Sequence, residues 1–198
     1  TFRILLLLGL FYPWTLQGQG EPGKKESLEL RLTETKGTPP AELLNRVQEL
    51  AAGLGEETPR ELDKTLRDEN FFERSEEYRF VAAALALNSK RAPGLRRIGL
   101  TAALVLSRKA TNSSIRLLAI RLLGESGDID RVKRTLAALL QEAPSKDQPR
   151  LLIATSLALE RLDNTGSRLP LLRLVHDTAR SFEIRSEAAL AIGRMSPR

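Results

Sequence analysis

Residues 112–143 constrain the fold more than any other stretch, because they join two apolar helical patterns across a short break. The first pattern recurs at the spacing of one helix face, at Ile115, Leu118, Ala119 and Leu122. The second recurs in the same way, at Ile129, Val132, Leu136, Leu139 and Leu140. A hairpin of two such helices cannot bury both apolar faces alone, so it requires similar hairpins on either side.

The break itself is predicted at Gly124 and Gly127, where the apolar pattern stops. Asp128 follows and is placed to cap the second helix, because its carboxylate can accept hydrogen bonds from the first free N–H groups. The sequence therefore predicts a tight turn between two antiparallel helices.

Further hairpins are predicted on both sides of this one, at a regular period. Four first helices align on an arginine, at Arg79, Arg116, Arg150 and Arg185, with offsets of 37, 34 and 35 residues. Small or apolar pairs follow each arginine after three and four residues, at Ala82/Ala83, Ala119/Ile120, Ile153/Ala154 and Ala188/Ala189. First helices are predicted at about 75–88, 112–124, 147–162 and 181–195, and second helices at about 93–109, 129–142 and 166–176. Self-similarity at this period is typical of a helical solenoid.

These segments resemble HEAT repeats of the short bacterial, bilin-lyase-like kind. The resemblance depends on the arginine followed by Ala or Leu, and on the LGESGD turn at 123–128, and it covers residues 75–198. It implies an all-α fold, in which antiparallel helix hairpins stack into a right-handed solenoid and the second helices line the concave surface. The sequence departs from the pattern at 163–166, where the turn lacks the Leu-Gly opening.

The N-terminal residues 1–20 are predicted to be a signal peptide. Arg3 supplies a positive charge, an apolar run follows at 4–14, and Gly18 and Gly20 offer the small residues of a cleavage site. The run is too short for a membrane-spanning helix, which needs about 20 apolar residues. We therefore expect export to a periplasm or to the extracellular space. A buried N-terminal helix of the domain itself is the alternative.

The remaining chain is predicted to form one helical-repeat domain over 38–198, preceded by a flexible or edge segment at 21–37. That segment is polar, with an alternating patch at 28–32 that suits either a short strand or the opening of a helix. The domain is expected to begin with a helix that Thr38 caps, with Pro39 in its first turn.

Charged residues separate by region along the chain. The net charge is −5 over residues 56–77 and +9 over 79–134, within a total of +6. If the second helices line a concave surface, their basic side chains would attract an acidic protein partner. The residues predicted to bind it are Arg96, Arg97, Arg108, Arg131, Lys133 and Arg134. Alternatively these are ordinary solvated faces, and the acidic N-terminal part folds against the basic middle.

The four aligned arginines allow two interpretations as well. They could form a ladder for anions, or they could be structural, with apolar stems along the helix surface and heads bonded to a neighbouring turn.

Neither a catalytic nor a metal-binding constellation is predicted. The chain has no cysteine, and its one histidine, His176, lies beside Asp177 with no serine placed as a nucleophile. We expect a non-enzymatic interaction scaffold without a cofactor. One alternative is nucleic-acid binding in a basic groove, which export would argue against. Another is a lyase or chaperone for a small cofactor, which an apolar pocket between hairpins would favour.

Overall fold

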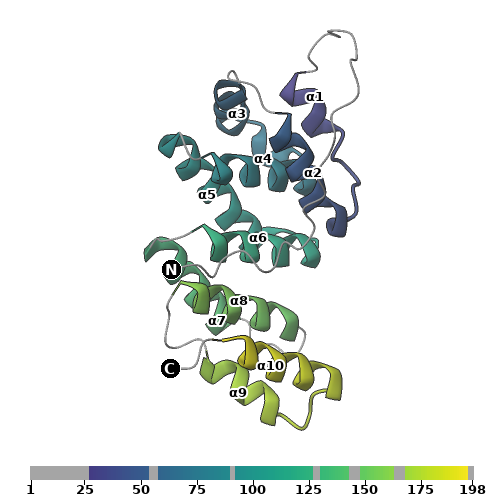
Figure 1. The fold of residues 1–198 in the computed structure, drawn as a ribbon, viewed down its shortest axis with the longest axis vertical. Helices are drawn as coiled ribbons and strands as arrows, with labels where there is room; N and C mark the ends of the chain where they lie inside the picture. Colours follow the sequence, from purple (N-terminus) through teal and green to yellow (C-terminus); the bar gives the residue numbers. More distant parts are fainter. Residues whose placement is uncertain are drawn as a thin grey trace, which may run out of the picture.

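The computed structural model describes residues 27–53, 58–89, 92–126, 130–142, 148–162 and 168–195, and every regular element in these ranges is helical (Figure 1). The all-α prediction is therefore confirmed. From residue 75 onwards the observed bounds differ from the predicted ones by at most two residues. The elements are α1 (Leu28–Thr33), α2 (Pro40–Ala52), α3 (Thr58–Arg67), the 3-10 helix η1 (Phe71–Glu73), α4 (Glu76–Asn88), α5 (Pro93–Lys109), α6 (Ser113–Glu125), α7 (Asp130–Glu142), α8 (Pro149–Arg161), α9 (Arg168–His176) and α10 (Phe182–Arg194).

Several predictions lie outside the described residues: the signal peptide at 1–20, residues 21–26 of the segment at 21–37, the break at Gly127, the cap at Asp128 and the irregular turn at 163–166. Among the helices that are described, none combines the length and the apolar character needed to cross a membrane.

Local residue chemistry explains where the helices begin. Ser27, Ser75, Asn112 and Ser181 each accept a hydrogen bond from a backbone N–H in the first turn of α1, α4, α6 and α10. Proline lies in the first turn of α2, α5 and α8. Backbone N–H groups in a first turn make no hydrogen bond within the helix, so proline, which lacks the N–H, costs no hydrogen bond there.

The prediction that Thr38 caps α2 is wrong. The helix begins at Pro40, and Pro39 precedes it with extended backbone angles of φ −54° and ψ 137°. A residue before proline is disfavoured in the helical region, so Pro40 keeps Pro39 out of the helix. The N–H of Thr38 instead donates to the carbonyl oxygen of Thr35 at 3.0 Å.

The expectation of a flexible or edge segment at 21–37 is wrong for its second half, which forms α1. Leu28 and Leu32 are one helical turn apart and almost fully buried. Glu29 joins α1 to α4, because it accepts a hydrogen bond from the Tyr78 hydroxyl at 2.6 Å and pairs with Arg74 at 3.0 Å. Burial, together with this bond to Glu29, raises the pKa of Tyr78.

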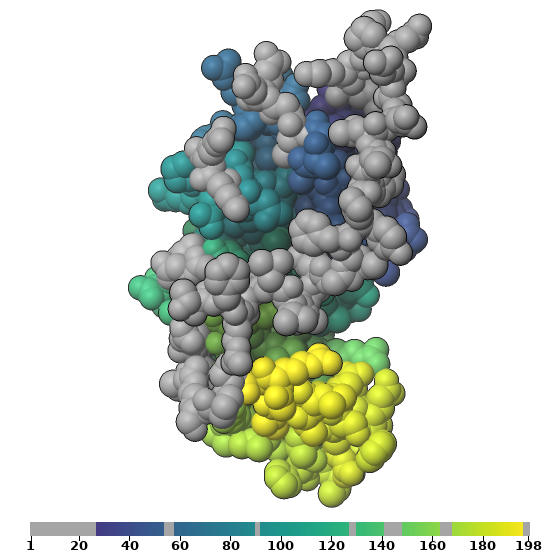
Figure 2. Space-filling view, viewed as in Figure 1, coloured from purple at the N-terminus to yellow at the C-terminus, as the bar shows by residue number. Residues whose placement is uncertain are grey.

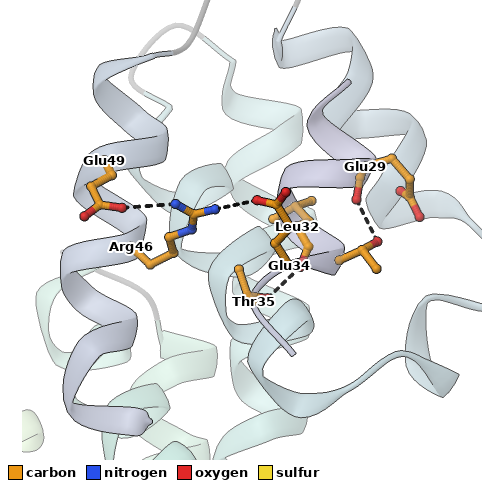
Figure 3. A network of polar contacts seen from close by, with 7 residues as sticks. Glu29, Leu32, Glu34, Thr35, Arg46 and Glu49 are labelled. Carbon is orange, nitrogen blue, oxygen red and sulfur yellow. Dashed lines mark hydrogen bonds and ion pairs between the residues drawn. The ribbon is translucent and has the colours of Figure 1, made fainter. Parts of the chain in front are cut away.

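A second polar contact joins the end of α1 to α2. Arg46 lies between two carboxylates, at 2.8 Å from Glu34 and 3.2 Å from Glu49 (Figure 3). The same turn buries the Thr35 hydroxyl, which donates to the carbonyl oxygen of Leu32 at 2.6 Å (Figure 3). Polar side chains therefore connect the N-terminal helices of the domain, although their sequence pattern alone predicts solvated surface positions.

Helices α4, α6, α8 and α10, here called the first helices, lie parallel in successive layers (Figure 1). At the start of α4, Glu76 accepts hydrogen bonds from the N–H groups of Thr111 and Asn112, directly before α6. At the start of α8, Arg150 pairs at 2.8 Å with Glu183 in the first turn of α10. Their N-termini therefore share one edge of the molecule, which we call the N-terminal edge.

The opposite ends of the first helices also meet. Arg161 at the end of α8 lies 3.0 Å from Glu125 at the end of α6. We call this side the C-terminal edge. Each neighbouring pair of first helices is therefore joined by a polar contact at one of these two edges.

The prediction that Gly124 breaks the helix is wrong. Helix α6 continues through Glu125, and Gly124 is buried inside it. A Cβ atom at Gly124 would lie 2.8 Å from the Cα atom of Ala158 in α8. Similarly, a Cβ atom at Gly99 in α5 would lie 2.6 Å from the Cβ atom of Ala86 in α4. These glycines allow the backbones of neighbouring helices to approach closely.

Two apolar clusters fill the space between the layers. The larger cluster extends from Leu28 in α1 to Leu162 after α8. The smaller one joins α8 to the last hairpin, through Ile153, Leu171, Leu174, Ala188, Ala191 and Met195. Helix α8 therefore contributes to both clusters and connects α9 and α10 to the rest of the domain.

We predict that Gly124→Ala lowers the free energy of unfolding by about 1–3 kcal/mol, because the new Cβ atom overlaps the backbone of α8. Gly193→Ala is the matched control, since Gly193 occupies the same repeat position in α10 and a Cβ atom there meets nothing within 4 Å. This control should stabilise the protein by about 0.5–1 kcal/mol, as alanine replaces glycine inside a helix. Denaturant unfolding measures both changes, and equal effects would contradict the close approach at Gly124.

We predict that Glu76→Gln lowers the free energy of unfolding by about 1–2 kcal/mol at neutral pH, because it weakens the cap that α4 provides for α6. Burial raises the pKa of Glu76, but the hydrogen bonds from Thr111 and Asn112 and the charge of Arg79 outweigh it, and the pKa lies below 4.5. A lowered pKa stabilises the fold above the unfolded value, and this stability is lost as pH falls through the folded value.

The difference between wild type and Glu76→Gln should therefore be largest at neutral pH and shrink as the pH falls below 4.5. Urea unfolding at several pH values measures it. A difference that is constant from neutral to acidic pH would contradict a role for the ionised carboxylate.

Candidate functional site

The C-terminal edge brings together the starts of α5 and α7. A guanidinium nitrogen of Arg96 (Nη2) donates to the carbonyl oxygen of Ser126 at 3.2 Å, and Ser126 ends α6. Helix α7 begins only four residues later, at Asp130. The first two turns of α5 and of α7 therefore lie beside the ends of α6 and α8.

The structure places five of the six predicted partner-binding residues at this edge. All five lie in the first two turns of α5 or α7, and we call them the basic edge: Arg96, Arg97, Arg131, Lys133 and Arg134. Lys133 is half-buried, and the other four are exposed.

The sixth predicted residue, Arg108, does not belong to the basic edge. It lies eleven residues after Arg97 in the same helix, about 17 Å along the helix axis. That distance places it at the opposite end of α5, near the start of α6.

The positive charge of the basic edge has no carboxylate partner within the described part of the chain. Arg97, Arg131 and Lys133 make neither an ion pair nor a hydrogen bond there, while Arg96 and Arg134 donate only to backbone carbonyl oxygens. Elsewhere arginines pair with carboxylates, at Arg46, Arg67, Arg74, Arg121, Arg150, Arg161 and Arg180. Among the described residues, the acidic stretch therefore makes no ion pair with this edge.

Sequence analysis missed two further cations of the C-terminal edge. Glu125 pairs at once with Arg121 at 3.2 Å and with Arg161 at 3.0 Å, so one carboxylate faces two guanidinium groups. The spacing of Arg121 and Glu125, four residues in one helix, was a readable signal. No such spacing marks Arg161, because it lies 36 residues from Glu125 in the sequence. The two residues meet only because α6 stacks on α8.

A groove of about 480 Å³ lies at the N-terminal edge, between the starts of α6 and α8. Its walls combine guanidinium, hydroxyl and amide groups with apolar side chains, from Ser113, Ser114, Arg116, Leu117, Gln148, Pro149, Arg150, Leu151 and Ile184. This mixed lining suits a ligand with an anionic group and an apolar part.

Only two of the four aligned arginines make a contact that agrees with the structural interpretation. Arg116 donates from Nε to the carbonyl oxygen of Ser107 at 3.5 Å, and Arg150 bridges Glu183 and Glu187 of α10. Arg79 and Arg185 are half-buried along their helices. Arg150 therefore connects α8 to α10, and Arg116 connects α6 to the end of α5, whereas the Nε atoms of Arg79 and Arg185 are buried without a hydrogen-bond partner among the described residues.

The described ranges contain no group of three or more His, Asp or Glu side chains that could hold a metal ion. His176 is exposed at the end of α9, and Asp177 is engaged by Arg180 at 3.2 Å. The site with the most distinctive chemistry is therefore the unpaired positive charge of the basic edge.

Comparison with protein-family models, with curated proteins and with solved structures found no match to this chain. A function can therefore be argued only from the geometry and the charge described above.

Proposed function

We propose that this chain is an exported, non-enzymatic interaction scaffold, a right-handed HEAT-like solenoid whose basic edge binds an acidic protein partner. The parallel first helices support the solenoid, because their aligned arginines recur every 34–37 residues and each layer contacts mainly its neighbours (Figure 1). Such an array presents an extended surface without requiring a catalytic centre.

The observation that carries the proposal is the uncompensated charge of the basic edge. Exposed cations are attracted to an acidic surface over roughly 10 Å at moderate salt. The location adds to this attraction, because helix N-termini also favour anions. Helix α5 has no acidic residue in its first turn to satisfy that preference, and Arg96 and Arg97 follow directly.

An acidic protein is favoured over a nucleic acid by the composition of the edge. Single-stranded nucleic acids are held by aromatic side chains that stack on bases as well as by cations. The described aromatic residues, Phe71, Phe72, Tyr78, Phe80 and Phe182, lie in η1, α4 and α10, away from the starts of α5 and α7. The predicted export supports the same choice.

We predict that the double variant Arg97→Glu/Arg131→Glu binds an acidic polypeptide about thirtyfold more weakly, since each charge reversal costs roughly 1 kcal/mol and the two together roughly 2 kcal/mol. Both side chains are exposed and make no ion pair or hydrogen bond within the described residues, so the fold should be unaffected. The measurement is fluorescence anisotropy with labelled polyglutamate at low and high salt, with labelled double-stranded DNA as the second probe.

The matched control is Lys109→Glu, an exposed charge reversal at the far end of α5. It should leave polyglutamate binding almost unchanged. Equal losses in the control and in the double variant would show that net charge alone governs binding. Tighter binding of DNA than of polyglutamate at matched salt would favour the nucleic-acid alternative.

We predict that the protein recovered from the cell envelope or medium of a bacterial host starts near Glu21, because residues 1–20 are removed during export. N-terminal sequencing of each cell fraction measures this. Cytoplasmic protein that retains the apolar run at 4–14 would overturn the export proposal and would return nucleic-acid binding to consideration.

A further inference from the structure

Exposed large apolar side chains occur only in the end layers of the described structure. Two of them lie in α1 and η1, and four lie in α9 and α10: Leu30, Phe72, Leu169, Leu172, Phe182 and Leu190. None lies in α4 to α8. Figure 1 shows that α1 is at one end of the stack and α9 and α10 are at the other. The two end layers therefore expose large apolar side chains, whereas the described layers between them do not.

The outward face of α10 is an apolar stripe. Phe182, Ala189, Leu190 and Gly193 recur at helical spacing and are all exposed, with Phe182 at 78% and Leu190 at 62%. The opposite face of the same helix packs into the smaller apolar cluster. Helix α10 is thus apolar on two sides, as a helix between two layers is, while Phe182 and Leu190 are exposed on one of them. Figure 2 shows α10, in yellow, on the surface at one end of the molecule.

Gly193 indicates that this outward face is shaped for another helix. It lies eight residues after Arg185, as Gly124 lies eight residues after Arg116. A Cβ atom at Gly124 would meet the backbone of α8, whereas one at Gly193 would meet nothing within 4 Å. The repeat position that contacts the next layer inside the stack is therefore vacant at this end.

The charges of the two ends are complementary. Beside the outward face, Arg173 and Arg194 are exposed and have no partner in the described ranges. At the other end, Glu69 and Glu73 are exposed around Phe72 and are likewise unpaired in those ranges. Pairing two identical basic ends would bring like charges together, while pairing opposite ends joins cations to carboxylates over apolar contacts.

We propose that copies of this chain associate head to tail, with the outer face of α9 and α10 docked on the α1–η1 end of the next copy. Such a contact joins two different surfaces, so each added copy leaves one end of each kind free. This inference is independent of the proposed function, because the basic edge lies on the intermediate layers and stays accessible in the assembly.

The test combines two variants that each remove the apolar side chains of one end without adding a charge. Phe182→Gln/Leu190→Gln removes apolar side chains from the outer face of α10, here called the C-terminal face. Leu30→Gln/Phe72→Gln removes them from the α1–η1 end, here called the N-terminal face. All four side chains are exposed, so thermal unfolding should show that both variants remain folded. Arg97→Gln is the control on an intermediate layer. Sedimentation velocity of the full chain over the micromolar range measures the mass.

We expect the mass of the wild-type protein and of Arg97→Gln to rise with concentration above 22.0 kDa. Each end variant alone should remain at 22.0 kDa, and an equimolar mixture of the two should reach twice that mass, because one intact end of each kind remains. A wild-type mass of 22.0 kDa at every concentration would overturn the proposal.

Two other results would also overturn it. Association of Leu30→Gln/Phe72→Gln alone would show that two C-terminal faces pair with each other. Failure of the mixture to associate, with a self-associating wild type, would show that the contact uses other surfaces. Polyglutamate binding by the same variants is measured separately, so loss of association and loss of partner binding are distinguishable.

Discussion

The close approach of neighbouring helices is the constraint on which the rest of this structure depends. Where Gly124 meets Ala158 and Gly99 meets Ala86, no side chain separates the backbones. Helix α6 can therefore lie close to α8, and a contact between the ends of these two helices, that of Glu125 with Arg161, can form. A larger side chain at Gly124 would separate α6 from α8 in the next layer, and one at Gly99 would separate α5 from α4 within one hairpin.

Parallel stacking also decides how charge is distributed. Because the first helices share one direction, the helices that follow them start at the opposite edge, and the basic first turns of α5 and α7 lie side by side. Carboxylates compensate the arginines that join layers, as Glu125 does for Arg161 and Glu183 does for Arg150. The cations of the basic edge face solvent instead, where they are available to a partner.

The ends of such an array differ from its interior for a simple physical reason. An internal layer is covered on both sides, so both of its faces can be apolar, whereas an end layer is covered on one side only. Helix α10 keeps the composition of an internal layer while its outer face is exposed, as the 78% exposure of Phe182 shows. The N-terminal end is covered more fully, because α1 buries Leu28 and Leu32 beside α4.

The sequence by itself determined the helices, most of their bounds and the separation of charge. These features depend on contacts within about four residues, such as the Asn112 cap, and on apolar periods that can be counted along the chain. Such local signals also located the five residues of the basic edge, but not Arg121 and Arg161, which the structure brings to the same edge.

Only the tertiary structure decided which distant residues meet. It buried Gly124 inside a helix, joined Glu125 to Arg161 across 36 residues, and separated Arg108 from the basic edge. The polar segment at 21–37 also contains α1, which packs on the domain because Leu28 is buried there. These outcomes depend on the distance and register between layers. Local sequence patterns do not specify them, because residues about 35 positions apart interact only after the layers have packed.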